Sequence, residues 1–463
     1  MVLPDDPLAD GILAFAKRLR NGQTTALATT EAYLARIEAV NSQLRAFCHV
    51  AHDTACSTAS AVDKLIAAGV DLGPLMGVPV AIKDNIAVRG MPTRAGSELF
   101  LTELIGDEGP FILALRRAGC VILGKAQTVE FAIGAAGPNY NMGTPRNPWD
   151  TRDFRLPSGS SGGSAVAIAA GLCGFAVGTD TGGSVRGPAS FCGVFGLKST
   201  QGTWSLDGIL PMSRTLDSLG PLTRTAADAA VVWATLTNSD VPRSRDIAGL
   251  RIGIARDYLW ENIDDTVATT MNSALLTLER AGARIVEINS PELRESDHIF
   301  QCISRSELLS MIGRERFEAD RSKMNPDVAD RISTALTVET ETYIRAYWRM
   351  QELSRIGRQL FDEVDVIAGP TKRACAPVFA DRFISLEEDR RLAVLCAGPT
   401  RSANVLGLCA SSQPIQQCGP SSLPIGLQLL GPGAGEGGLL SIAMAVENML
   451  PPAPRVNLHS WCK

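Results

Sequence analysis

Short apolar runs alternate with helical patterns through the first half of the chain, beginning near Pro74. The apolar runs are too short for core helices and have the length of buried strands. In chain order, the pattern predicts a strand at 78–82, a helix at 111–118, a strand at 120–123, a helix at 165–170 and a strand at 174–179. Such alternation favours an α/β fold, a sheet with helices on both faces.

The same alternation returns in the second half. The predicted elements there are a strand at 250–254, a helix with Val267, Met271, Leu275 and Leu278 on one face, a strand at 284–288, a mixed-charge helical block at 292–363 and a strand at 364–368. Upstream, residues 9–70 have helical spacing, with a break predicted at Asn41 and Ser42. No Pro/Gly-rich linker divides the chain cleanly. We therefore predict one large domain over 1–463, with a helical N-terminal layer and a helical insertion at 290–360.

The charge balance argues against two classes of partner. The 463 residues carry a formal net charge of -5, which gives no electrostatic case for nucleic acid or an anionic membrane surface. The most apolar stretch, 165–178, is too short to cross a bilayer. The first residues have acids where a secretory signal has bases. We expect a chain that works away from membranes, without nucleic acid.

The cysteines indicate a reducing compartment. Their number, 11, is odd, and no Cys-x-x-Cys pair occurs. Five of them lie among apolar neighbours: Cys48, Cys56, Cys120, Cys173 and Cys192. Reduced, buried thiols in a cytoplasmic protein fit this usage better than a disulfide framework.

Two glycine loops and one lysine carry the candidate chemistry. Ser184 follows Gly182 and Gly183 at a predicted strand end, where glycines let successive backbone N–H groups point at one spot. Such donors stabilise the oxyanion that forms on a carbonyl. Considered alone, this loop is better explained as a plain turn, because Gly-Gly-Ser is a common sequence.

Ser160 and Ser161 lie in a second glycine-framed loop, just before a predicted helix. An N-cap with a flexible loop, or a nest for a phosphate, are the alternatives. The phosphate alternative is weakened because no Gly-x-x-x-x-Gly-Lys-[Ser/Thr] pattern is present. This loop is ambiguous by itself.

Lys83 ends an uncharged run, directly before Asp84 and Asn85. A lysine at a strand end usually reaches solvent. If the ammonium is buried instead, desolvation lowers its pKa toward neutrality, and a neutral amine can take the proton of a serine nucleophile. No His-Glu-x-x-His cluster predicts a metal, and no Gly-x-Gly-x-x-Gly turn predicts a nucleotide cofactor.

Together, these segments resemble the signature of the amidase signature family of serine hydrolases. The matching segments are 77–85, 159–164, 178–186 and 191–198, with further similarity at Gly124-Lys125, Glu130-Phe131, Asn147-Pro148 and 423–428. The likeness runs from about residue 10 to 450. It implies a large mixed β-sheet flanked by helices, a catalytic core segment at 60–235, and a pocket shaped in part by the insertion at 290–360.

The resemblance also implies a Ser–cis-Ser–Lys triad. Ser184 matches the nucleophile, Ser160 the bridging serine on a cis peptide bond, and Lys83 the general base and acid. The expected oxyanion hole consists of the N–H groups of Thr181, Gly182, Gly183 and Ser184. Supporting roles are implied for Ser161, Asp180 and Arg186.

Some positions depart from the family pattern. Ser158 stands where the family commonly has glycine, and Gly187 replaces a larger residue after the arginine. Ser199 directly follows Gly-Leu-Lys, where the family often has proline. Residues 409–422 also differ from the glycine-rich stretch that usually precedes the family motif matched at 423–428. None of these positions belongs to the implied triad.

The function implied is hydrolysis of a small-molecule carboxylic amide to an acid and ammonia or an amine, through an acyl-serine and without a cofactor. One alternative is the glutamine-amidase subunit of a tRNA amidotransferase, which needs partner subunits and ATP. The other is a non-catalytic scaffold or anion-binding protein of the same fold. Residues 199–204 do not resemble the amidotransferase continuation, which favours the free enzyme. A homodimer is our working hypothesis for the assembly.

The sequence does not identify the residues that line the substrate pocket. Four aromatic residues in the second half of the chain are candidates: Trp260, Phe317, Tyr343 and Trp348. Aromatic side chains of this kind are also the usual filling of a core. We therefore predict a core position for each of the four.

Overall fold

The chain folds around one continuous β-sheet. In a computed structural model, which describes residues 3–99, 101–415 and 423–462, eleven strands form a single mixed sheet. The order across it is β1-β3-β2-β4-β6-β5-β10-β11-β9-β7-β8. The strands are β1 Phe47–Val50, β2 Pro79–Lys83, β3 Val121–Ala126, β4 Phe175–Asp180, β5 Phe195–Lys198, β6 Ser218–Thr223, β7 Arg251–Ile254, β8 Arg284–Glu287, β9 Val366–Pro370, β10 Cys409–Ile415 and β11 Ile425–Gly431.

The sheet consists of two parallel groups, an antiparallel middle and the antiparallel edge strand β1, which pairs with β3. Strands β3, β2 and β4 are parallel to one another, and so are β9, β7 and β8. The strands between these groups, β6, β5, β10 and β11, pair antiparallel. The sheet is therefore mixed, as the family resemblance implies.

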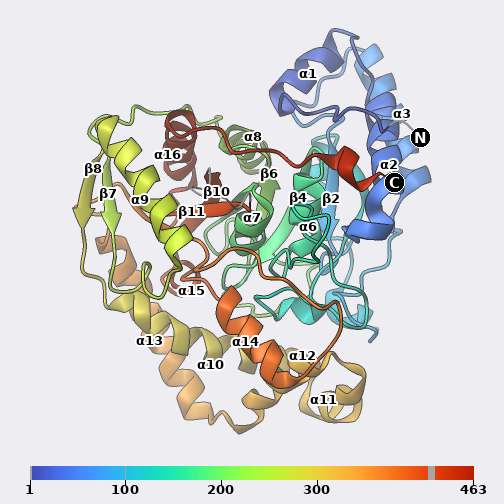
Figure 1. Cartoon of the computed structure of the whole chain (residues 1–463). Coiled ribbons are helices and arrows are strands. Elements are labelled where there is room, and N and C mark those ends of the chain that lie inside the picture. The colour runs from blue at the N-terminus through green and yellow to red at the C-terminus, as the bar shows by residue number, and fades with distance from the viewer. Residues whose placement is uncertain (1–2, 100, 416–422, 463) are drawn as a thin grey trace.

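Helices cover the sheet and extend beyond one end of it (Figure 1). The N-terminal helices α1, α2 and α3 lie beside β2, and α8, α9 and α16 lie around the other half of the sheet. The α-helices are α1 Ile12–Arg20, α2 Ala26–Leu44, α3 His52–Ala67, α4 Thr102–Ile105, α5 Pro110–Arg117, α6 Gly162–Ala169, α7 Arg186–Cys192, α8 Ala226–Thr237, α9 Asp265–Arg280, α10 Glu292–Ile312, α11 Arg314–Asp320, α12 Pro326–Ser333, α13 Thr340–Gln359, α14 Leu386–Cys396, α15 Arg401–Val405 and α16 Glu436–Met449. The 3-10 helices are η1 Glu130–Ala132, η2 Arg321–Lys323, η3 Thr334–Thr337 and η4 Leu458–Trp461.

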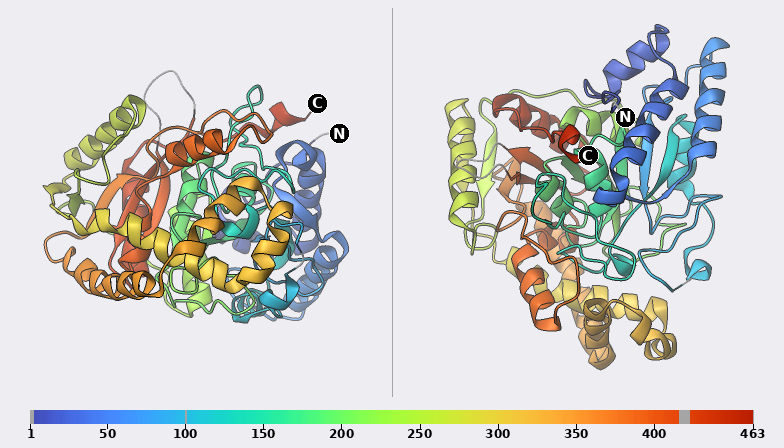
Figure 2. Two further views of the ribbon diagram at one scale, coloured as in Figure 1. Left: turned by 90° about the horizontal axis from the view of Figure 1, so that it is seen from below. Right: turned by 45° about the vertical axis from the view of Figure 1, so that its right-hand side comes forward.

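The predicted helical block forms α10 to α13, which lie across the lower end of the molecule (Figures 1 and 2). Their apolar side chains, among them Leu308, Phe317 and Val328, pack with Phe131 and Met212 from the loops at the end of the sheet. The helices thus cover the edge at which β2 and β4 end.

Most predicted elements are present, with boundaries that differ by at most four residues from the predicted ones. The N-terminal segment differs: α2 continues through Asn41 and Ser42 and ends at Leu44, so the predicted break there is wrong. Asn41 instead exchanges two 2.9 Å hydrogen bonds with the backbone of Phe47. These bonds join the end of the helix to β1, a strand that the helical pattern concealed.

The prediction of reduced, buried thiols is confirmed for three of the five cysteines considered. Cys120, Cys173 and Cys192 are free and buried, whereas Cys48 is exposed and Cys56 is half-buried. Apolar neighbours in sequence do not fix burial at the edge strand β1 or on the outer helix α3. Among the described residues, we found no helix long and apolar enough to span a bilayer.

Candidate active site

Two parallel strands deliver the lysine and the second glycine loop to one edge of the sheet. Lys83 is the last residue of β2, and Asp180 is the last residue of β4. The strands are neighbours in register, with Val80 opposite Phe175 and Ile82 opposite Val177. Because the carboxyl ends of parallel strands meet at the same edge, the two chain segments that follow them lie together.

The Lys83 side chain is fully buried and surrounded by oxygen atoms. Its Nζ lies 2.7 Å from Ser160 Oγ, 2.7 Å from Thr179 Oγ1 and 3.5 Å from the Thr179 carbonyl oxygen. Burial lowers the pKa of this lysine to about 7, although the charges of Asp217 and Asp180 act in the opposite direction. A neutral amine fits these three partners, with two N–H donors for Thr179 and a lone pair for the Ser160 hydroxyl.

The two glycine loops contact each other through their backbones. The peptide bond from Gly159 to Ser160 is cis, and the Ser161 N–H donates to the Ser184 carbonyl at 3.1 Å. Ser184 is half-buried and lines a pocket together with Gly159, Gly182 and Gly183. Within the described part of the chain, the Ser184 hydroxyl has no hydrogen-bond partner. The structure thus joins Lys83 directly to Ser160 and connects the Ser160 and Ser184 loops through their backbones. Among the described residues, no hydrogen bond joins the Ser160 and Ser184 hydroxyls.

The glycine loop presents backbone donors to this pocket. The Gly183 N–H donates to Asp180 Oδ1 at 2.8 Å, so this predicted oxyanion donor is already occupied. The N–H groups of Thr181, Gly182 and Ser184 have no acceptor among the described residues. Of these three residues, Gly182 and Ser184 line the pocket and Thr181 does not.

The backbone at Gly183 does not tolerate a side chain. Its φ is +121°, and a Cβ there would lie 2.1 Å from Thr400 Oγ1, the hydroxyl that donates to the Gly182 carbonyl at 2.7 Å. We expect Gly183→Ala to lower the free energy of unfolding and to displace the loop. The control is Gly202→Ala, which has a φ of +83° and open space around it. This control should cost only about 1 kcal/mol. Urea denaturation compares the two variants, and equal losses would contradict a sterically fixed loop.

The buried ion pair between Asp180 and Arg186 stabilises the same glycine loop. Asp180 accepts from the Val185 N–H at 3.1 Å and from two nitrogens of the Arg186 guanidinium at 3.1 and 2.9 Å. Burial opposes ionisation, but Arg186 holds the pKa of Asp180 well below its usual range. Arg186 also donates to the Thr400 carbonyl at 2.8 Å and to the side chains of Asn404 and Gln428, each at 2.7 Å.

Several residues of the site were not found from the sequence. Thr179 and Asp217 lie near the lysine, and Asp217 Oδ1 accepts from the Thr181 hydroxyl at 2.5 Å. Burial raises the pKa of Asp217 to about 6. Phe300 from α10 and Thr400 line the pocket. Of these, Thr179 lies within a segment already singled out, and the others lie far from it along the chain.

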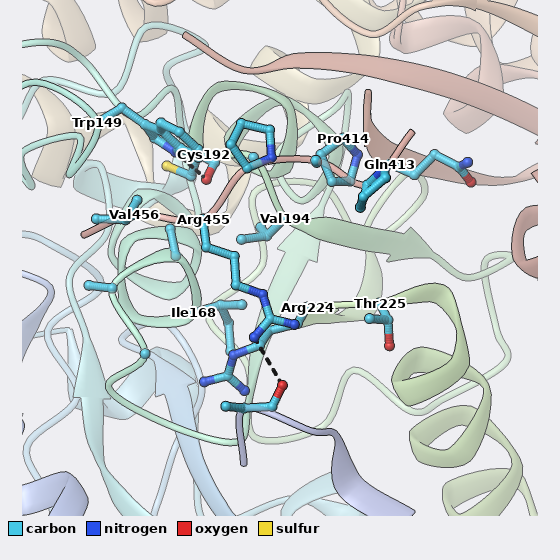
Figure 3. Close-up of a pocket in the computed structure, with 18 of the residues that line it drawn as sticks. Trp149, Ile168, Cys192, Val194, Arg224, Thr225, Gln413, Pro414, Arg455 and Val456 are labelled. Carbon is cyan, nitrogen blue, oxygen red and sulfur yellow. Dashed lines mark hydrogen bonds between the residues drawn. The ribbon is translucent and has the colours of Figure 1, made fainter. Parts of the chain in front are cut away.

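A larger cavity lies elsewhere and does not contain these groups. It has a volume of about 510 Å³ and lies where the two chain ends approach the sheet, between Trp149, Arg224 and Arg455 (Figure 3). Arg224 is held there by an ion pair with Asp6. The pocket at Ser184 is smaller, about 60 Å³, yet of the two it is the one that Ser184 lines.

Comparison with known proteins assigns the class. The model of the Amidase family matches residues 28–440, and the chain belongs to that family. A 2-amino-5-chloromuconic acid deaminase of Comamonas testosteroni is 37% identical, over 94% of this chain and 95% of its own length. A glutamyl-tRNA(Gln) amidotransferase subunit of Solidesulfovibrio magneticus is 35% identical, over 96% and 98%. A crystal structure of an amidase superposes with a TM-score of 0.87 at 29% identity, covering 95% of this chain and all of the other.

The family and the fold confirm the main prediction. The protein is an amidohydrolase with a large mixed sheet flanked by helices, and it is an enzyme rather than a scaffold of the same fold. The relatives include both a deaminase and amidotransferase subunits, so they do not by themselves identify the substrate.

Proposed function

We propose that the protein is a free-standing amidase that cleaves a small carboxylic amide through a covalent intermediate on Ser184. The observation that carries this proposal is the buried Lys83 amine 2.7 Å from Ser160 Oγ, beside a loop that presents Ser184. In this scheme Ser184 is the nucleophile, Ser160 the proton relay and Lys83 the base. Ser161, Asp180 and Arg186 support the two loops.

Acylation begins when Ser184 Oγ forms a bond to the amide carbon. Its proton passes to Ser160, whose own proton passes to the neutral Lys83 amine. The carbonyl electron pair moves to oxygen, and the free N–H groups of Thr181, Gly182 and Ser184 stabilise that charge. Lys83 then returns its proton along the relay to the leaving nitrogen, and the carbon–nitrogen bond breaks. Ammonia or an amine departs, and an ester remains on Ser184.

Deacylation repeats the sequence with water as the nucleophile. Water loses one proton to the relay and attacks the ester, and Ser184 recovers a proton as the acid leaves. The sum is one amide and one water consumed, and one acid and one ammonia or amine released. No external oxidant, reductant or nucleotide enters this balance.

The test is an amide panel assayed on the purified chain. We expect ammonia release without ATP or partner subunits, and a transient mass increase on Ser184 equal to the acyl group. The panel includes amino-substituted acids, because the Comamonas relative is by its name a deaminase of such an acid. Glutamine is included because of the amidotransferase relatives. Glutamine hydrolysis that requires co-purified subunits would favour the alternative.

The helical segment 290–360 contributes to the pocket in this proposal, since Phe300 and Arg305 of α10 line it beside Ser184. The homodimer and the cytoplasmic location remain predictions. Light scattering on the purified protein tests the first, and fractionation of cells that express it tests the second.

A further inference from the structure

The pocket beside Ser184 is rich in positive charge. Four of its lining residues are basic, and none of its lining residues is Asp or Glu. The four are Arg305, Arg331, Lys372 and Arg401. Cations that converge on a small, partly closed space raise the local concentration of anions and favour carboxylates in particular.

Lys372 is the most deeply buried of the four, with a relative exposure of 4%. It follows β9, and its Nζ donates to the Cys396 carbonyl at 2.5 Å and lies 5.5 Å from the centre of the Phe191 ring. Within the described residues it has no carboxylate partner. Burying a cation without a counter-ion is costly, so an anion that enters the pocket supplies a missing partner.

Arg305 is also without a carboxylate partner in the described part of the chain. It projects from α10, and its one hydrogen bond is to the Thr334 hydroxyl at 3.1 Å. Burial, together with the charges of Arg331 and Arg401, lowers the pKa of this guanidinium. An anion beside it relieves both the burial and the mutual repulsion.

The remaining two cations each have a carboxylate partner. Arg401 lies 2.8 Å from Asp297 and packs over the Phe300 ring at 4.9 Å. Arg331 lies 3.6 Å from Asp327. The acids offset these two charges, which leaves Lys372 and Arg305 as the two cations without an ion pair among the described residues. Asp180 and Asp330 act on them only from beyond ion-pair distance.

Gly187 explains how Lys372 reaches this position. A Cβ at Gly187 would lie 2.7 Å from both Cε and Nζ of Lys372. The departure from the family pattern at Gly187 therefore makes the space that Lys372 occupies. The glycine and the lysine together form a feature of this chain that the implied triad does not require.

We propose that Lys372 and Arg305 bind a carboxylate of the substrate, so that the preferred substrate is a half-amide of a short dicarboxylic acid. The small pocket requires the carboxylate and the amide carbon to lie close together, and it favours ammonia as the leaving group. Each turnover converts one half-amide and one water into a dicarboxylate and ammonia. This inference rests on the proposed function and specifies its substrate class.

The experiment compares half-amides with the matched neutral diamides, from malonamate and malonamide to adipamate and adipamide. Both members of each pair present the same carboxamide. We expect kcat/KM for at least one half-amide to exceed that of its diamide by about 10- to 100-fold, the range of one buried charge-assisted contact. The excess should shrink at high ionic strength.

Variants then connect this preference to the two cations. Lys372→Met and Arg305→Gln should each bring the ratio of half-amide to diamide kcat/KM down toward one. The control is Lys323→Met, which removes the same charge from a surface lysine paired with Asp320. The control should keep the wild-type ratio. Arg305→Gln keeps the test decisive if Lys372→Met fails to fold, because Arg305 is less buried.

Each outcome bears on a different claim. Diamides hydrolysed as well as every half-amide would overturn this inference and leave the amidase proposal standing. A half-amide preference that survives both variants would also overturn the assignment to Lys372 and Arg305. Hydrolysis of neither series, nor of any amide in the panel, would overturn the proposed function and this inference with it.

Discussion

Replacing Ser184 with alanine is expected to lower kcat by about 10⁴-fold or more, because it removes the hydroxyl that we propose as the nucleophile. The reason is specific to position: Ser184 is half-buried beside the free N–H groups of Thr181 and Gly182, and its hydroxyl has no other partner in the described chain. The variant removes only one oxygen, from a half-buried side chain without a hydrogen-bond partner among the described residues. Its thermal unfolding should therefore match that of the wild type.

The control for this variant is Ser190→Ala, which removes a buried hydroxyl from α7, the helix that follows the same loop, outside the pocket. It should keep the catalytic rate. A fluorophosphonate probe adds a second readout, since it should add its mass to the wild type and to Ser190→Ala but not to Ser184→Ala. Labelling of Ser184→Ala, or retention of its amidase rate, would remove Ser184 as the nucleophile.

The second large effect is expected at Lys83, where Lys83→Met should lower kcat by about 10³-fold or more through loss of the general base. In the wild type, kcat/KM should fall on acidification with a midpoint near pH 7. The sign follows from the pKa of about 7 that burial gives this lysine. Below that pH the amine is protonated and cannot accept the Ser160 proton. Above it the neutral form predominates, and activity reaches a plateau.

Lys198 offers a matched control for the pH profile. It is also fully buried, and burial lowers its pKa to about 8, but it donates to the carbonyls of Ser199 and Leu408, away from the pocket. Lys198→Met should leave the midpoint of the kcat/KM profile near pH 7, whatever it does to stability. A wild-type profile that stays flat down to about pH 5 would contradict a neutral lysine base.

The sequence predicted the parallel strands better than the antiparallel ones, for a physical reason. The stretches that form β2, β3 and β4 are continuous apolar runs buried on both faces. Strands β6 and β10 have the sequences SLGPLT and CASSQPI. Their Gly, Pro and Ser residues remove the apolar signal, although burial in the middle of the sheet is nearly complete.

Residues 416–422, part of the segment 409–422 that departs from the family pattern, lie outside the described residues.

The residues of the candidate site also differ in how far the sequence could predict them. Lys83, Ser160 and Ser184 could be proposed from the sequence because each lies in a local motif. The four pocket cations were not, because only the fold brings α10, α12, the end of β9 and α15 to one place. Among the aromatic residues considered for the pocket, Trp260 and Phe317 are core, whereas Trp348 is exposed and was wrongly expected to be buried. The spacing of residues along a helix shows which of them share a face, but not whether another part of the protein covers that face.

The contacts of Arg186 join the nucleophile loop to residues that are synthesised much later. The acceptors that hold its guanidinium at Thr400, Asn404 and Gln428 emerge from the ribosome more than 200 residues after it. A nascent chain that already contains Lys83, Ser160 and Ser184 therefore still lacks the contacts that fix the nucleophile loop. If Ser184 is the nucleophile, as proposed, we expect amide hydrolysis to begin only after the last seventh of the polypeptide has docked. Catalytic competence would then report completed folding.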